Sequence, residues 1–425
     1  MSDKTFKVTE PRLPSHFRVA AEWEPQSHVY LASCSENEID PSQFSNGNAT
    51  VMDVQLAIIQ AIHENTEVRI LVNAESEKLL YQTLLKEHDI SENVSFLTVD
   101  HCDIWLRDTG PVWAISATGE VAVVWMGFNN WGYAPYILGD WAQCDIPNNL
   151  PRNLAEQLDH KLVRSDLIGE GGDKSFNGKG SLICCRAVET DRNPELSLSA
   201  IEESLKKDFN LRKVIWVEAG LADDIQTFRV QAKYGGATLP DNTYTPLTTG
   251  GHVDEYCRFV SDNRVLLAEV HPEVRANDDE IALITHFNME GNLALLREQT
   301  DQDGKPLEII RIPLPPTMTR TIDQRDPIYK TLQELKGVDI NGPIKIVLAS
   351  SYCNYLISNG VICFPAYYRE GMDPLVKQID DEAFAIIQSQ FPDHKIVQID
   401  PAPLNAGGGG MHCISNNQPD MVVMN

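Results

Sequence analysis

Cys413 has the surroundings of a reactive thiol. It lies just beyond the run Gly407-Gly408-Gly409-Gly410. Because glycines carry no side chains, such a run lets the backbone approach another group closely. A thiolate is a good nucleophile toward carbon. The pattern predicts a nucleophilic cysteine beneath a tight loop.

Polar residues stand at the matching point of a similar local pattern in four other segments. They are Asp108, Glu170, His252 together with Asp254, and Asn354. Each precedes a strand-like run, a turn containing Gly or Asn, and a second strand-like run, as hairpins require. The second runs cover 121–126, 181–185, 265–270 and 361–364. We infer one structural unit repeated five times, with the fifth unit beginning near Cys413.

The five units predict how these residues come together. The polar residues are roughly 60 to 100 residues apart, which leaves room for a helix and further strands in each unit. Units of this size cannot each bury a core, so we expect them to close around one axis. Their leading residues would then converge on a common centre.

The rest of the chain alternates between strand and helix periodicity. Strands are predicted at 67–72 and 94–99, and amphipathic helices at 51–63 and 75–87. No Ser/Gly linker or charge block divides the sequence. We therefore expect an α/β protein with a single domain over residues 1–425.

A cysteine, a histidine and several acids together favour one kind of electrophile. The thiolate can attack carbon, the histidine can move a proton near neutral pH, and the acids can hold a cation. An amide hydrolase of the Cys-His type seldom needs three acids. Carboxylates suit a planar guanidinium, whose N–H groups they accept in a fixed fork geometry. On a strand, His252 and Asp254 would point to the same face.

Composition excludes several classes of partner. The chain has 425 residues, is 42% apolar and carries a formal net charge of −26, which disfavours nucleic acid and anionic membrane surfaces. The polar N-terminus lacks a signal peptide's apolar core, and no run is long enough to span a bilayer. Nine scattered cysteines without a CxxC pair indicate free thiols in the cytoplasm. We expect a small cationic ligand, and the sequence leaves a homo-oligomer open.

A metal site is the competing interpretation of the same residues. His252, Asp254 and Cys413 could in principle ligate a divalent ion. Mixed ligands without a second histidine match common metal-site spacings poorly. We therefore expect neither a metal nor a cofactor.

Six ordered motifs carry a resemblance to a known family. The chain resembles agmatine deiminases and the related bacterial peptidylarginine deiminases from about residue 18 to about residue 420. The motifs are Ala21-Glu22-Trp23-Glu24-Pro25-Gln26, Trp105-Leu106-Arg107-Asp108-Thr109-Gly110-Pro111, Glu170-Gly171-Gly172, Gly251-His252-Val253-Asp254, Ser351-Tyr352-Cys353-Asn354-Tyr355 and Gly408-Gly409-Gly410-Met411-His412-Cys413.

The resemblance implies a fold and a set of catalytic roles. The fold would be the five-bladed α/β propeller (pentein) of guanidino-group-modifying enzymes, built from ββαβ-type units around a central site. Cys413 would attack the guanidinium carbon, and His252 would protonate the departing ammonia and then activate water. Asp108 and Asp254 would grip the guanidinium nitrogens, although Asp108 could instead pair with Arg107. Glu170 would stabilise the protonated form of His252.

Further residues are expected beside the substrate. Trp105, Asn354 and Gly410 complete the substrate-binding set that the resemblance implies. Asn354 could equally hydrogen-bond a neighbouring loop. Trp105 and Trp131 could wall the substrate channel or belong to ordinary core packing.

Two departures from the family pattern leave the substrate open. An insertion at about 222–248, with the basic residues Arg229 and Lys233, is a candidate lid or specificity loop. The segment Asp173-Lys174-Ser175-Phe176 stands where the family usually has a more apolar strand. The expected reaction is hydrolytic deimination of a small agmatine-like or arginine-like guanidino compound through a covalent cysteine thiouronium. Peptidylarginine deimination, amidinotransfer and non-catalytic guanidinium binding are the alternatives.

Overall fold

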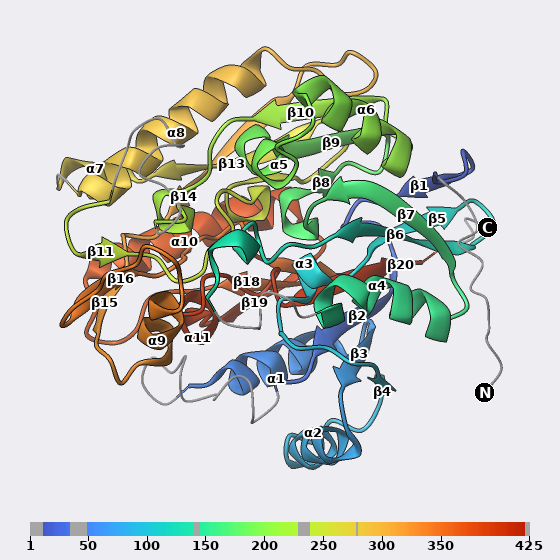
Figure 1. Ribbon diagram of the computed structural model, residues 1–425, viewed down its shortest axis with the longest axis horizontal. Coiled ribbons are helices and arrows are strands. Elements are labelled where there is room, and N and C mark those ends of the chain that lie inside the picture. The colour runs from blue at the N-terminus through green and yellow to red at the C-terminus, as the bar shows by residue number, and fades with distance from the viewer. Residues whose placement is uncertain (1–11, 35–48, 139–144, 228–238, 278, 421–425) are drawn as a thin grey trace.

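Strands and helices alternate along the chain in a mixed α/β fold (Figure 1). The structure is a computed structural model, and it describes residues 12–34, 49–138, 145–227, 239–277 and 279–420. Helices α1, α2, α6 and α8 lie toward the outside of the molecule. Strand β2 near the start of the chain lies beside β20 near its end, because these two strands pair directly.

The described residues form six sheets. In order across each sheet, these are β20 (Ser415–Pro419), β2 (Gln26–Ala32), β3 (Glu67–Val72) and β4 (Val94–Thr98); β1 (Phe17–Val19), β5 (Val112–Ser116), β6 (Val121–Gly127) and β7 (Lys161–Ile168); β8 (Ser175–Phe176), β9 (Ser181–Cys185) and β10 (Lys213–Val217); β12 (Cys257–Phe259), β13 (Arg264–Val270) and β14 (Glu308–Leu314); β17 (Leu356–Ser358), β18 (Val361–Pro365) and β19 (Lys395–Ile399); and β11 (Thr243–Tyr244), β16 (Ile344–Val347) and β15 (Thr319–Ile322).

Five of these sheets share one pairing pattern. A short strand pairs antiparallel with a middle strand, as in β5–β6, β8–β9, β12–β13, β17–β18 and β20–β2. The middle strand then pairs parallel with the next, as in β6–β7, β9–β10, β13–β14, β18–β19 and β2–β3. A parallel pair needs a long crossover, and each of these crossovers contains a helix. The repetition predicted from the sequence is therefore present as five similar sheets.

Helices connect the strands and cover the sheets. They are α1 (Val51–Ile62), α2 (Glu75–Glu87), α3 (Leu106–Thr109), α4 (Asp145–Gln157), α5 (Arg186–Arg192), α6 (Leu198–Phe209), α7 (Pro272–Ala276), α8 (Glu280–Arg297), α9 (Pro327–Gln333), α10 (Pro374–Gln390) and α11 (Ala402–Asn405). The short 3-10 helices include η2 (Ala134–Tyr136), η4 (Gly171–Asp173), η5 (Ala222–Asp224) and η6 (Val253–Glu255).

Helix α1 illustrates how the sequence fixes an element. Thr50 and Asp53 form a capping box, each side chain accepting a hydrogen bond from the other residue's backbone N–H. Ile58, Ile59 and Ile62 are fully buried and belong to the same apolar cluster as strand β3. Burying each such side chain contributes about 1.5–3 kcal/mol. The predicted helices at 51–63 and 75–87 and the predicted strands at 67–72 and 94–99 are confirmed to within one residue.

The insertion at 222–248 lies only partly within the described residues. Residues 228–238, which include Arg229 and Lys233, fall outside them. Within the described part, the insertion begins with η5 and contributes β11, which pairs with β16.

None of the described helices is both long enough and apolar enough to cross a membrane.

Candidate active site

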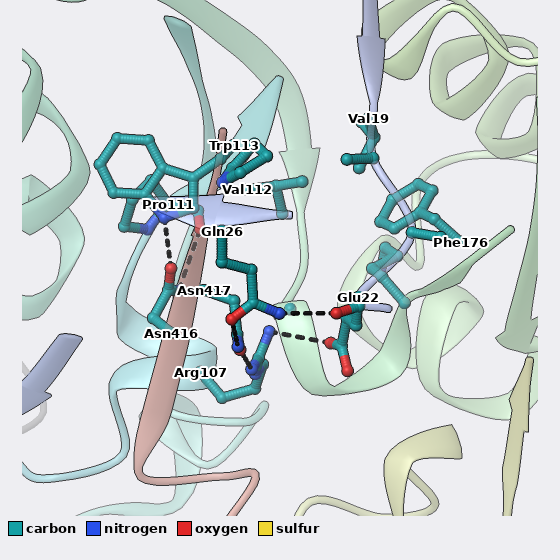
Figure 2. Close-up of a pocket in the computed structure, with 15 residues that line it drawn as sticks. Val19, Glu22, Gln26, Arg107, Pro111, Val112, Trp113, Phe176, Asn416 and Asn417 are labelled. Atoms are coloured by element: carbon teal, nitrogen blue, oxygen red, sulfur yellow. Dashed lines mark hydrogen bonds and ion pairs between the residues drawn. The ribbon is translucent and has the colours of Figure 1, made fainter. Parts of the chain in front are cut away.

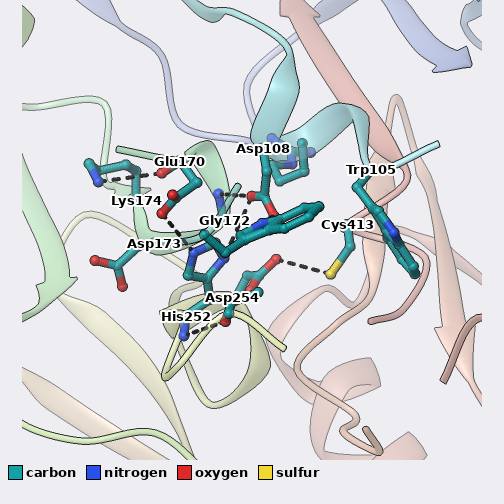
Figure 3. A network of polar contacts seen from close by, with 12 residues as sticks. Trp105, Asp108, Glu170, Gly172, Asp173, Lys174, His252, Asp254 and Cys413 are labelled. Atoms are coloured by element: carbon teal, nitrogen blue, oxygen red, sulfur yellow. Dashed lines mark hydrogen bonds and ion pairs between the residues drawn. The ribbon is translucent and has the colours of Figure 1, made fainter. Parts of the chain in front are cut away.

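Each of the five similar sheets carries a predicted site residue just before the short strand that pairs antiparallel with its middle strand. Asp108 lies in α3 before β5, Glu170 directly precedes η4 and β8, and Asp254 lies in η6 before β12. Asn354 precedes β17, and Cys413 precedes β20. The contacts described below join these residues in one buried site, so the expected convergence is confirmed in its geometry (Figure 3).

His252 lies between two carboxylates. Its Nε2 is 3.2 Å from Oε2 of Glu170, and its Nδ1 is 3.5 Å from Oδ1 of Asp108. Burial alone lowers the pKa of His252, but Asp108 and Glu170 overcome this and raise it to about 10. His252 is therefore an imidazolium at neutral pH.

Glu170 has a second cationic partner that the sequence did not indicate. Arg192 from α5 donates from Nε to both Glu170 oxygens, at 2.8 and 3.2 Å. Burial raises the pKa of Glu170, yet Arg192 and His252 lower it to about 2. The predicted partnership of Glu170 with His252 is present, and Arg192 keeps the carboxylate ionised.

Asp108 faces the site rather than its sequence neighbour. Its Oδ2 accepts from Trp131 Nε1 at 2.8 Å, and its Oδ1 accepts from the Gly172 N–H at 3.0 Å. Arg107 instead lies 3.2 Å from Glu22. The alternative of a simple Arg107–Asp108 pair is therefore not what the structure contains.

The backbone at Gly172 comes very close to the acid and histidine groups. A Cβ added to Gly172 would lie 2.5 Å from Nδ1 of His252, 2.8 Å from Oδ1 of Asp108 and 3.2 Å from Oδ2 of Asp254. These three polar atoms surround one short stretch of backbone. A side chain at this position would displace at least one of them.

A loop and a 3-10 helix position His252 and Asp254, so the predicted strand at this point is wrong. His252 caps η6, and Asp254 lies within that helix. Gly251 has φ +127°, a conformation that glycine adopts readily. Asp224 accepts hydrogen bonds from the backbone N–H groups of Thr249, Gly250, Gly251 and His252 at 2.7 to 3.2 Å. These bonds give the backbone N–H groups of the turn a partner. In the expected strand, a neighbouring strand would have supplied that partner.

His412 forms a short polar contact with Asp254. Nδ1 of His412 is 2.7 Å from Asp254 Oδ2, and Nε2 is 2.8 Å from Glu22 Oε1. Arg258 also pairs with Glu22. Burial raises the pKa of Asp254, but the hydrogen bond and charge of His412 outweigh it and lower the pKa. Asp254 is therefore a carboxylate.

The Cys413 thiol sits among acids. Its Sγ is 3.6 Å from Oδ2 of Asp254 and 3.6 Å from Oε1 of Glu255. Burial and these two carboxyl groups raise the pKa of the Cys413 thiol well above its ordinary range. Asn354 Nδ2 donates to the sulfur at 3.1 Å. An anionic nucleophile here requires a cation to offset the acids.

Trp105 and Asn354 lie against residues 407–413, here called the nucleophile loop. A Cβ on Gly409 would lie 2.8 Å from the Trp105 ring and 3.0 Å from Cys413 Sγ, and one on Gly410 would lie 2.5 Å from Asn354 Oδ1. Figure 3 shows Trp105 on the side of the sulfur away from Asp254. The glycines of this loop therefore permit the close approach that the sequence predicted.

Two buried polar atoms retain unused hydrogen-bonding capacity. Among the described residues, neither Nδ1 of His252 nor Oδ1 of Asp254 has a hydrogen-bond partner. Both side chains are almost completely buried. Leaving such atoms unpaired costs free energy, so a polar ligand that supplied partners would be favoured.

The ligand atoms of Asp254, Glu255 and Cys413 lie within 4.8 Å of one another, close enough to share a metal ion. The metal site considered from the sequence included His252, but among the described residues His252 is not part of this cluster. The same atoms can equally surround a guanidinium, which presents N–H donors to carboxylates.

A separate cavity lies beside Arg107 (Figure 2). Its volume is about 60 Å³, and its walls include Glu22, Arg107 and Lys174 but neither Cys413 nor His252. Two cationic side chains and one acid do not suit a cationic ligand. This cavity is therefore not the candidate active site.

Sequence reasoning missed four groups that shape the site: Arg192, Asp224, Glu255 and His412. Glu255 and His412 are direct neighbours of predicted site residues, which was a usable signal. Arg192 and Asp224 stand apart from every motif, so only the fold reveals their contacts.

The comparison with protein families decides the relationship. The model for Porphyromonas-type peptidyl-arginine deiminase matches residues 18–232 and 238–419. The chain belongs to this family. The resemblance inferred from the motifs is therefore confirmed.

Two relatives named agmatine deiminase match the chain over nearly its whole length. The agmatine deiminase of Pseudomonas aeruginosa (strain LESB58) is 29% identical over 413 residues, covering 95% of each chain. That of Ectopseudomonas mendocina (strain ymp) is 28% identical over 425 residues, covering 98% of each chain.

Solved structures share the fold of this member of the Porphyromonas-type peptidyl-arginine deiminase family. The agmatine deiminase of Enterococcus faecalis aligns with a TM-score of 0.73 at 23% identity, covering 97% of this chain and 99% of that one. The agmatine deiminase of C. jejuni aligns with a TM-score of 0.64 at 18% identity, covering 96% and 97%.

Proposed function

We propose that the protein is a deiminase that hydrolyses a small guanidino compound to the ureido product and ammonium. The observation that carries this proposal is the placement of the Cys413 thiol, the His252 imidazolium and the Asp108 and Asp254 carboxylates around one buried site. Family membership and relatives named agmatine deiminase support the same reaction.

The charges suggest how a substrate activates the nucleophile. A guanidinium held by Asp108 and Asp254 supplies N–H donors to both carboxylates, including the unpaired Asp254 Oδ1. Its positive charge offsets the acids that raise the pKa of the Cys413 thiol. The Cys413 thiol then loses its proton to solvent, and the thiolate forms in contact with the electrophile.

The chemical steps balance with water as the only co-reactant. The sulfur of Cys413 attacks the guanidinium carbon, and His252 protonates the departing nitrogen, which leaves as ammonia. Water then attacks the remaining thiouronium: one of its protons returns to His252, and the other passes to the released ammonia, which becomes ammonium. Breaking the C–S bond releases the ureido product and restores the thiolate.

The five similar sheets support a five-bladed α/β propeller as the arrangement around this site. Each sheet contributes one of the converging residues from the segment before the short strand that pairs antiparallel with its middle strand. We further propose a single catalytic domain over residues 1–425 that acts in the cytoplasm, where free thiols are maintained.

The substrate tail is the open part of the proposal. Cys413, His252 and Asp254 are each at most 5% exposed, which favours a slender free guanidino compound over an arginine within a folded protein. Agmatine-like compounds come first because relatives bear that name. Arginine and peptidyl arginine belong in the same assay.

The test is a panel assay with mass spectrometry. Agmatine, arginine and an arginine peptide are incubated with the protein, and the products and ammonia are measured. We expect a mass increase of about one unit per converted guanidino group, and loss of turnover in Cys413→Ala with unchanged thermal unfolding. Binding without any product would instead favour a non-catalytic guanidinium-binding protein. An adduct with an added amine in place of the ureido product would favour amidinotransfer.

A further inference from the structure

Asn354 has a fixed orientation at the nucleophile. Its Oδ1 accepts from the backbone N–H of His412 at 2.9 Å and of Cys413 at 3.4 Å. Only the oxygen of the amide can accept these bonds, so the NH₂ group must point the other way. There it lies 3.1 Å from Cys413 Sγ and 2.8 Å from Oε1 of Glu255.

Glu255 completes this arrangement. The NH₂ group of Asn354 has two hydrogens, and the two observed contacts use one for the sulfur and one for the carboxyl oxygen. Glu255 is 5% exposed and directly follows Asp254 in η6. A Cβ added to Gly410 would lie 2.5 Å from Asn354 Oδ1, so a larger residue there would displace the amide.

We propose that Glu255 is a positioning residue, which aims the Asn354 amide so that it donates a hydrogen bond to the Cys413 thiolate. This role rests on the proposed function of Cys413 as nucleophile. The donor is needed because Asp108, Asp254 and Glu255 all face the sulfur and disfavour its negative charge. A hydrogen bond to an ionised acceptor is about twice as strong as a neutral one.

The Glu255 carboxyl keeps an acceptor oxygen whether or not it is ionised. Burial, together with Asp254, Asp224 and Asp223, raises the pKa of the Glu255 carboxyl well above its usual range. A neutral carboxyl still accepts a hydrogen bond through its carbonyl oxygen. Glu255 can therefore orient Asn354 in either protonation state.

A matched pair of variants separates the acceptor from the charge. Glu255→Gln keeps an oxygen acceptor of the same reach, whereas Glu255→Met fills the space without one; neither is ionisable. Alkylation of Cys413 by iodoacetamide is followed against pH in the absence of substrate, with mass spectrometry of the Cys413 peptide. We expect the alkylation midpoint to be about one pH unit higher in Glu255→Met than in Glu255→Gln, the effect of losing one charge-assisted hydrogen bond.

The Asn354→Ala background provides the internal control. Since Glu255 acts through Asn354, Glu255→Gln and Glu255→Met should then have the same midpoint. Thermal unfolding verifies that each variant is folded, and Glu255→Ala replaces Glu255→Met should the latter not fold.

Two results would overturn the positioning role. One is an equal midpoint for Glu255→Gln and Glu255→Met when Asn354 is present. The other is a raised KM with an unchanged midpoint, which would place Glu255 on the substrate itself. Because the midpoint is measured without substrate, failure of this inference is distinct from failure of the deiminase proposal, which depends on product formation.

Discussion

At the scale of single residues, the site is a set of opposed charges with His252 at its centre. Asp108 and Glu170 contact the two ring nitrogens, and Arg192 holds Glu170 as a carboxylate. Burial makes every one of these charges costly without its partner. The imidazolium is therefore a property of the group of residues, and changing one carboxylate should change the proton affinity of the histidine.

Asp108→Asn tests this coupling through stability against pH. The folded protein holds the His252 proton up to a pKa of about 10, whereas an unfolded histidine releases it near 6.5. Unfolding therefore releases a proton in this window, so His252 contributes its full stability below pH 6.5 and loses it as the pH rises to 10. We expect Asp108→Asn to flatten this decline, as measured by chemical unfolding across that range. Parallel curves for the two proteins would contradict the coupling.

At the scale of elements, short 3-10 helices and loops carry the chemistry while strands and long helices support them. Helix η4 brings the Gly172 backbone against His252 and Asp108, and η6 presents Asp254. The loop before β20 presents Cys413. A Cβ added to Gly408 of this loop, whose φ is +102°, would lie 3.0 Å from the carbonyl oxygen of Leu247 at the end of the insertion. The insertion thus ends beside the nucleophile loop.

Two glycine substitutions test this division. Gly172→Ala places a Cβ within 2.8 Å of polar atoms of His252 and Asp108, so we expect it to lower kcat/KM by about a hundredfold through misplacement of those groups. Gly291→Ala, in the interior of α8 with no atom within 4 Å of the new Cβ, serves as the control. It should keep activity and stabilise the fold by about 0.5–1 kcal/mol. Steady-state kinetics and thermal unfolding measure both, and full activity in Gly172→Ala would be incompatible with the assigned site.

At the scale of the whole molecule, the net negative charge of the chain and the acidic residues of the candidate site both favour a cationic ligand. The chain has a formal net charge of −26, and the buried Asp254 carboxylate beside Cys413 can pair with a cation. A strongly negative protein concentrates small cations near its surface, and salt screens this effect over about 10 Å at 0.1 M. Acidity therefore favours the proposed substrate class in addition to solubility.

Ionic strength should reveal this attraction. We expect kcat/KM for a cationic guanidino substrate to fall about two- to tenfold from low to physiological salt, mainly through KM. Alkylation of Cys413 by uncharged iodoacetamide is the control, and it should depend much less on salt. Equal salt dependence of the two reactions would show that long-range attraction does not contribute.

Periodicity, turn residues and motif spacing are local properties of the chain, so they were enough to predict the elements at 51–63, 67–72, 75–87 and 94–99, the fivefold repetition and the residues that converge. The sequence by itself could not determine the loop geometry at His252, where Asp224 supplies four hydrogen bonds from a distant segment. Nor could it reveal Arg192 beside Glu170 or Glu255 behind Asn354. Those contacts join residues far apart in sequence, and only tertiary packing brings buried charges close enough to set one another's protonation.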